Sequence, residues 1–124
     1  MKFLLLVLVG ISPLLAQRKV IERPEIKYPP LARLGNIEGA VYAFALIDEG
    51  GQISETSVKV GPRLLRQAVE DNLRLWKFDK ADKKTQIHLE VIFKLGDQKS
   101  ETFDQQKMEL TVRDKFIHYN NQPR

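Results

Sequence analysis

The chain has 124 residues, no cysteine and a formal net charge of +4, and its length suits one modest domain. The absence of cysteine excludes a disulfide scaffold, a thiol nucleophile and a thiolate zinc site. The positive charge does not indicate nucleic-acid binding, because lysine and arginine alternate with acidic residues and form no basic block interleaved with aromatics. We therefore expect no nucleic acid among the partners.

The N-terminus has the pattern of an export signal. Lys2 is followed by an apolar run from Phe3 to Ala16, after which the sequence turns polar. The run is shorter than the ~20 apolar residues that span a bilayer. We predict that residues 1–16 are a signal peptide, and that cleavage leaves 108 residues in the periplasm or outside the cell. Leu14 is larger than the small residue usual before a cleavage site, so an uncleaved inner-membrane anchor is the alternative.

The mixed, charged residues 17–27 are predicted to form a short leader. Tyr28-Pro29-Pro30 then introduces one to two helical turns, because a proline fits the first turn of a helix, and Gly35-Asn36 ends them. From Glu38 the apolar period changes to two, which predicts a strand. One face of this strand carries Val41, Ala43, Ala45 and Ile47, and the other carries Tyr42, Phe44 and Leu46.

Asp48-Glu49-Gly50-Gly51 supplies a hairpin turn, and a return strand is predicted from Gln52 to Val60. Residues 63–76 form the clearest helix, with Leu64, Leu65, Ala68, Val69, Leu75 and Trp76 on one stripe. Asn72 interrupts that stripe. We predict that its amide binds the backbone of an adjoining loop; a ligand-binding role is the alternative.

Alternation returns from Ile87 to Leu95 and predicts a further strand, which Gly96-Asp97 ends. The tail, residues 98–124, shows weaker strand patterns at Met108–Val112 and Phe116–Tyr119, and we expect a disordered end after them. Part of residues 105–120 is predicted to pair with the edge of the sheet and to compete there with any external strand.

No motif in the chain indicates an enzyme. His88 and His118 are 30 residues apart and have no partners at metal-ligand spacing. The chain has no G-x-S-x-G elbow and no glycine-rich phosphate loop. We predict no catalytic residue, no metal site and no cofactor.

Several short motifs carry a family resemblance when they are taken in order. These are Tyr28-Pro29, Glu38-Gly39, Ile47-Asp48-Glu49 with Gly51, Trp76 with Phe78, and Val91-Ile92-Phe93. Residues 28–95 thereby resemble the C-terminal domain of TonB, the periplasmic energy transducer of Gram-negative bacteria. The resemblance implies an α+β fold, with a small antiparallel sheet of three to four strands and two helices packed on one face. We assign residues 28–97 to this domain and 98–124 to a C-terminal extension.

The resemblance also implies that the chain binds a protein of the cell envelope, such as an outer-membrane receptor peptide, by strand addition. A full transducer has a long proline-rich spacer, whereas the eleven leader residues reach about 40 Å at most, at ~3.3–3.6 Å each. The leading hypothesis is therefore a periplasmic binding module that uses a sheet edge or a sheet face. The alternative is an anchored TonB-type component of energy-dependent outer-membrane transport.

Two sets of residues are candidates for partner binding. The closing strand offers its backbone at Ile87, His88, Leu89, Glu90, Val91, Ile92 and Phe93. Tyr42, Phe44 and Leu46 are larger and more apolar than a solvent-facing surface requires. For this second set, cover by the C-terminal tail and a partner or homodimer interface are equally weighted alternatives.

Overall fold

The computed structural model describes residues 18–117. The predicted signal peptide, His118 and the end predicted to be disordered lie outside these residues. The elements in chain order are β1 (Val20–Glu22), α2 (Pro30–Leu34), β2 (Gly39–Ile47), β3 (Ile53–Val60), α3 (Arg63–Leu73), β4 (Lys77–Phe78), β5 (Thr85–Gly96), β6 (Ser100–Asp104) and β7 (Glu109–Lys115).

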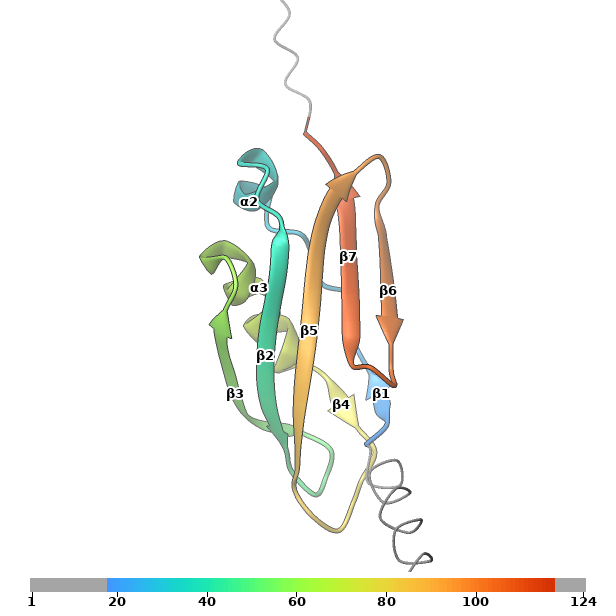
Figure 1. The fold of residues 1–124 in the computed structure, drawn as a ribbon. Coiled ribbons are helices and arrows are strands. Elements are labelled where there is room, and N and C mark those ends of the chain that lie inside the picture. The colour runs from blue at the N-terminus through green and yellow to red at the C-terminus, as the bar shows by residue number, and fades with distance from the viewer. Residues whose placement is uncertain (1–17, 118–124) are drawn as a thin grey trace, which may run out of the picture.

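The main sheet has five strands in the order β3-β2-β5-β7-β6, and β1 and β4 form a separate antiparallel pair (Figure 1). All neighbours in the main sheet are antiparallel except β5 and β7, which run parallel. After β5 the chain runs back along the outer edge as β6. It then returns as β7 into the space between β5 and β6.

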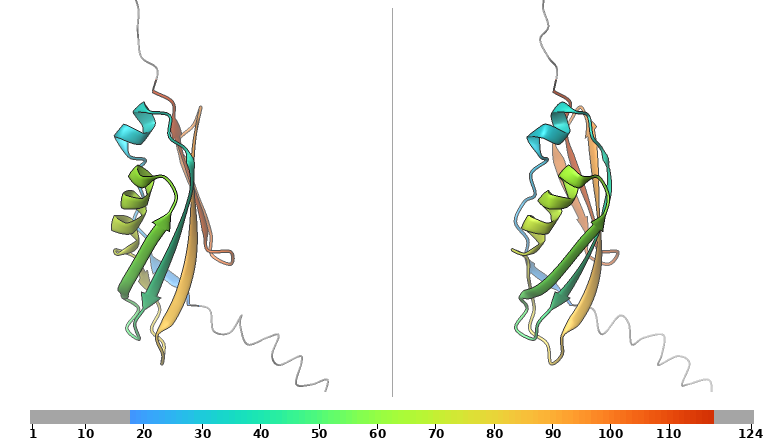
Figure 2. Two further views of the ribbon diagram at one scale, coloured as in Figure 1. Left: turned by 60° about the vertical axis from the view of Figure 1, so that its left-hand side comes forward. Right: turned by 90° about the vertical axis from the view of Figure 1, so that its left-hand side faces the viewer.

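The predicted α+β class is confirmed, and both helices lie on the same face of the main sheet (Figure 2). The prediction of three to four antiparallel strands is wrong, because the main sheet is mixed and has five strands and a two-stranded sheet accompanies it. The additional strands come from segments whose sequence shows weak alternation. β1 belongs to the predicted leader, and β6 and β7 belong to the tail.

The core lies between the helices and the inner face of the main sheet. The face of β2 that carries Val41, Ala43, Ala45 and Ile47 is buried, and Leu65 and Val69 of α3 are buried with it. The predicted helical stripe extends too far, because α3 ends at Leu73 and Leu75 is 58% exposed. Two backbone hydrogen bonds there span three residues instead of the four of an α-helix. Leu75 N–H donates to the Asn72 carbonyl, and Trp76 N–H donates to the Leu73 carbonyl, which turns the chain.

Asn72 has the structural role that its position predicts. Its Nδ2 donates to the carbonyl oxygens of Pro24 (3.1 Å) and Glu25 (3.3 Å). Its Oδ1 accepts a hydrogen bond of 2.8 Å from the indole Nε1 of Trp76. The buried amide is therefore satisfied, and it holds the N-terminal segment against α3.

Arg18, at the start of the described chain, is buried with 4% exposure. Its guanidinium donates to the carbonyls of Asp48 (3.1 Å), Lys83 (3.3 Å) and Asp79, and to the Thr85 hydroxyl (3.1 Å). It thereby ties together the hairpin turn after β2 and the loop before β5. The segment predicted to be a leader is packed on the domain from residue 18 onward.

We expect Trp76→Ala to lower the free energy of unfolding by about 3–5 kcal/mol, because it empties a large buried volume. The indole is 1% exposed, and its ring centroid lies 5.3 Å from that of Phe103 and 6.1 Å from that of Phe78. Urea unfolding measures the loss. Leu75→Ala is the matched control on the exposed neighbour, and equal losses for the two variants would contradict this core assignment.

The raised pKa of Tyr28 predicts that the folded protein loses stability at alkaline pH. Burial, followed by the negative charges of Glu38 and Asp114, raises the pKa of Tyr28 from 10.0 to about 12. The neutral phenol is favoured in the folded state, so this contribution is complete below pH 10.0 and is lost as the pH rises through about 12. The fall in melting temperature over that range should be smaller in Tyr28→Phe than in the wild type. Parallel profiles for the two proteins would refute the assignment.

Candidate functional site

The strand nominated for partner binding, β5, is paired along both edges from Glu90 to Phe93. β2 lies along one edge from Thr85 to Phe93, and β7 lies along the other from Glu90 to Gly96. The prediction that part of residues 105–120 pairs with the sheet is confirmed, by β7 at Glu109–Lys115. One or two weak strands are predicted in the tail: the pattern at Met108–Val112 falls in β7, whereas Phe116 and Ile117 are not in a strand.

Among residues 18–117, no strand pairs with the first half of β5 on the β7 side. The ladder begins where Glu90 N–H donates to the Met108 carbonyl at 3.1 Å, and it closes where the Gly96 carbonyl accepts from Phe116 N–H at 3.2 Å. Met108 has a positive φ of 53°, which turns the chain away from β5. Among the described residues, no strand extends this pairing to the residues of β5 that precede Glu90.

Strand geometry gives the direction of the backbone groups in this open stretch. Because the N–H and C=O groups of successive residues point to opposite edges, those of even-numbered residues in β5 face β7. The groups of Gln86 and His88 therefore point past the end of β7, while those of Ile87 and Leu89 pair with β2. We call the free backbone groups of Gln86 and His88 the open half-edge.

The predicted edge residues have three different environments. Leu89, Val91 and Phe93 are buried on the helix side and belong to the core, so a partner strand could meet only their backbone. Glu90 and Ile92 are half-buried on the outer face, and Ile87 is half-buried on the inner face. His88 is exposed. The strand predicted from Ile87 starts one residue after Gln86, although the period-two alternation through His88 and Glu90 extends to it.

The outer sheet face carries the second set of candidates. Tyr42 is 50% exposed, Phe44 and Leu46 are half-buried, and the Phe44 ring lies 5.5 Å from that of His88. β6 and β7 extend the sheet sideways, so the described part of the tail does not cover this face. Hollows of about 200 and 220 Å³ lie on either side of Tyr42. A hydrogen bond to the Glu90 carboxylate raises the pKa of Tyr42 above its ordinary value.

Residues 18–117 contain no cluster of histidine and acidic side chains arranged to hold a metal ion. Over the same residues, no helix has the length and apolar character needed to cross a membrane.

Comparison with known proteins identifies the family. The sequence model of the Gram-negative bacterial TonB protein C-terminal domain matches residues 24–95. The chain belongs to this family. The solution NMR structure of the TonB C-terminal domain of Pseudomonas aeruginosa has the same fold, with a TM-score of 0.53 and 21% identity over 62% of this chain and 85% of that one. No curated protein sequence matches the chain.

TonB C-terminal domains are non-catalytic protein-interaction domains that act in periplasmic envelope transport, which implies a protein-binding role for the family. The matched residues exclude β1, β6 and β7. The strands that cover the second half of β5 are thus additions to the part of the chain that defines the family.

Amide exchange measured by NMR tests the open half-edge. The amides of Ile87 and Leu89 should exchange slowly because they bond to β2, whereas those of Gln86 and His88 should exchange fast. From Glu90 onward, even-numbered amides should also be slow because β7 accepts their hydrogen bonds. If the amides of Gln86 and His88 exchanged as slowly as that of Leu89, another segment would have to cover this edge.

Proposed function

We propose that the protein is a periplasmic binding module whose partner adds an extended segment to β5 at the open half-edge. The observation that carries the proposal is the difference in length between β5, with 12 residues, and β7, with 7. The uncovered stretch, residues 85–89, is about 16 Å long at ~3.3 Å per residue, which is enough to pair with a short peptide strand.

A hollow at the Leu89 end of this stretch can accept a side chain of a partner strand. The hollow of about 220 Å³ lies where β7 begins, and its lining includes His88, Leu89, Lys107 and Met108. A partner strand placed in line with β7, alongside residues 85–89 of β5, would have one end beside this hollow. Backbone pairing would supply affinity, and a side chain in the hollow would supply specificity.

The other two strand edges are less suited to strand addition. The outer strand β3 pairs irregularly with β2, with register shifts at two places, and it carries the charged residues Glu55 and Lys59. Irregular pairing and charge are features that oppose strand addition. β6 has five residues, and its Glu101 binds Arg23 at 2.6 Å and the backbone N–H of Ile26 at 2.9 Å.

Arg18, two residues after the end of the apolar run, is buried in the domain. If the apolar segment stays in the inner membrane, as the anchored alternative requires, the domain lies at the surface of that membrane. The mass of the exported protein separates the alternatives, since cleavage after Ala16 leaves Gln17 as the first residue.

A photo-crosslinking residue in place of Gln86 should capture the partner in intact cells, because this position borders the open half-edge. The matched control is the same replacement of Gln67, an exposed glutamine on α3. The expected result is one envelope protein crosslinked from position 86 and not from 67. Equal labelling from both positions would count against a binding site at this edge.

Proline at residue 88 separates edge pairing from side-chain contact. His88→Pro removes an N–H that faces the open half-edge, whereas His88→Ala removes only the imidazole. We expect partner capture from position 86 to fall at least about tenfold in the proline variant and to change little in the alanine variant. Thermal melts establish that both variants fold. If the two lose capture equally, the imidazole rather than the backbone carries the interaction.

A further inference from the structure

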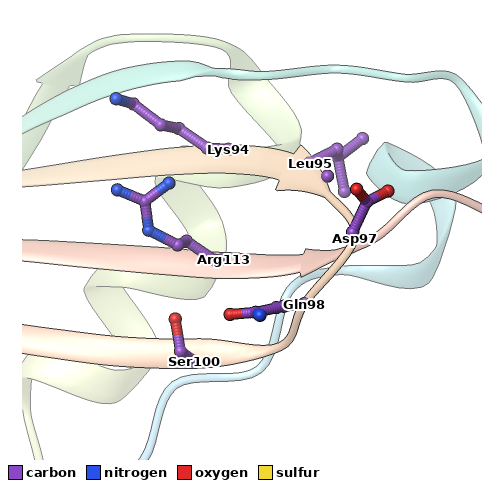
Figure 3. A pocket seen from close by; sticks show the side chains of 7 residues that line it. Lys94, Leu95, Asp97, Gln98, Ser100 and Arg113 are labelled. Atoms are coloured by element: carbon purple, nitrogen blue, oxygen red, sulfur yellow. The ribbon is translucent and has the colours of Figure 1, made fainter.

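The outer face of the main sheet carries a row of basic side chains. Lys94 of β5 and Arg113 of β7 are in register as neighbours, and both are exposed. Figure 3 shows the two side chains on neighbouring strands, with Ser100 and Gln98 on the far side of Arg113 from Lys94 and Asp97 turned away from both. These residues line a hollow of about 360 Å³. We call Lys94 and Arg113 the basic row.

A row of acidic side chains lies on the same face, nearer the start of β5. Glu90 of β5 is in register with Glu109 of β7, and Glu109 is in register with Asp104 of β6. We call these three residues the acidic row. Midway between the two rows lies an uncharged row formed by Ile92, Thr111 and Thr102.

Both arrangements place like charges next to each other, which destabilises a sheet. No ion pair among the described residues joins a member of either row to an opposite charge. The rows are four residues apart along β5, or about 13 Å, so salt at ~0.15 M screens their attraction within one chain. Within the described residues the acidic row meets neutral donors, the Tyr42 hydroxyl at Glu90 and the Lys107 backbone N–H at Asp104, and no ion pair reaches either row.

We propose that a second copy of the chain docks on this face, turned by 180° about an axis that runs along the uncharged row. The basic and acidic rows lie two residues to either side of that axis along β5. The rotation therefore places Lys94 over Glu90 of the second copy and Arg113 over Glu109 of the second copy, and the reverse. This is a self-complementary interface of the kind that two-fold dimers use.

The dimensions and the chemistry both favour a second copy as the occupant. Stacked sheets lie about 10 Å apart, a gap that a long basic side chain and a facing carboxylate can span together. An anion would compensate only the basic row. A second copy compensates both rows, because its rows are separated by the same distance as those of the first. Exposed ion pairs are individually weak, so the dimer is expected to be weak and sensitive to salt.

Analytical ultracentrifugation of the exported chain tests the proposal. In about 10 mM salt, where charges act over roughly 30 Å, the mass should rise from one chain to two as the protein concentration increases. In about 1 M salt the protein should remain a single chain at the same concentrations. Single-chain mass under all conditions overturns the proposal.

Charge reversal supplies the decisive variants. Arg113→Glu alone and Glu109→Arg alone should each remain single chains, because each places like charges face to face. An equimolar mixture should regain the two-chain mass, since residue 113 of one variant then meets residue 109 of the other with opposite charge at both contacts. Arg63→Glu, on the exposed surface of α3, makes the same charge change away from this face and should leave the dimer intact.

Thermal melts and circular dichroism check that each variant is folded. Recovery of the two-chain mass in the mixture is itself evidence of folding, because misfolded variants would not regain the dimer. A dimer that persists in Arg113→Glu overturns the proposal, as does a mixture that behaves like its separate components. The test is independent of the proposed function, because it involves side chains of the outer face rather than the free backbone of Gln86 and His88.

Discussion

The parallel ladder between β5 and β7 is the constraint on which the other features of the sheet depend. β6 runs back along the outer edge first, so β7 has to fill the space between β5 and β6 in the same direction as β5. In this position Leu110 and Val112 are buried on the inner face, and Arg113 and Glu109 are placed on the outer face beside Lys94 and Glu90. The ladder begins at Glu90, where Met108 turns the chain away, and the open half-edge results from that turn.

The N-terminal segment fastens these added strands to the rest of the domain. Val20 N–H donates to the side chain of Gln105 in the turn between β6 and β7, at 3.2 Å, and Arg23 pairs with Glu101 of β6. The Arg23 guanidinium also lies 5.1 Å from the Phe103 ring centroid and 5.8 Å from that of Trp76. Both ends of the described chain therefore stabilise each other through contacts distant in sequence. Such contacts carry the entropic cost of closing long loops, which slows folding.

The sequence predicts the elements whose signal is local. Period-two alternation locates β2 and β5 and assigns their inner faces, and the polar Asn72 within an apolar stripe indicates its loop contact. β1 and β4 have three and two residues, too few to show a period, and β6 is mostly polar. The burial of Arg18 is invisible in a charged run because its acceptors are carbonyls up to 65 residues away. The half-edge depends on where β7 stops, which is a matter of register between distant segments.

The energetics of β7 indicate which part of β5 an external strand can use. Displacing β7 would expose Leu110 and Val112, each worth about 1.5–3 kcal/mol of burial. A tethered strand also acts at an effective concentration in the millimolar range, so a free peptide at about 1 µM competes at a disadvantage of roughly a thousandfold. That ratio corresponds to about 4 kcal/mol before any side chain is exposed. A partner at the open half-edge displaces no strand of the described residues, and the β6–β7 hairpin can stay in place while it binds.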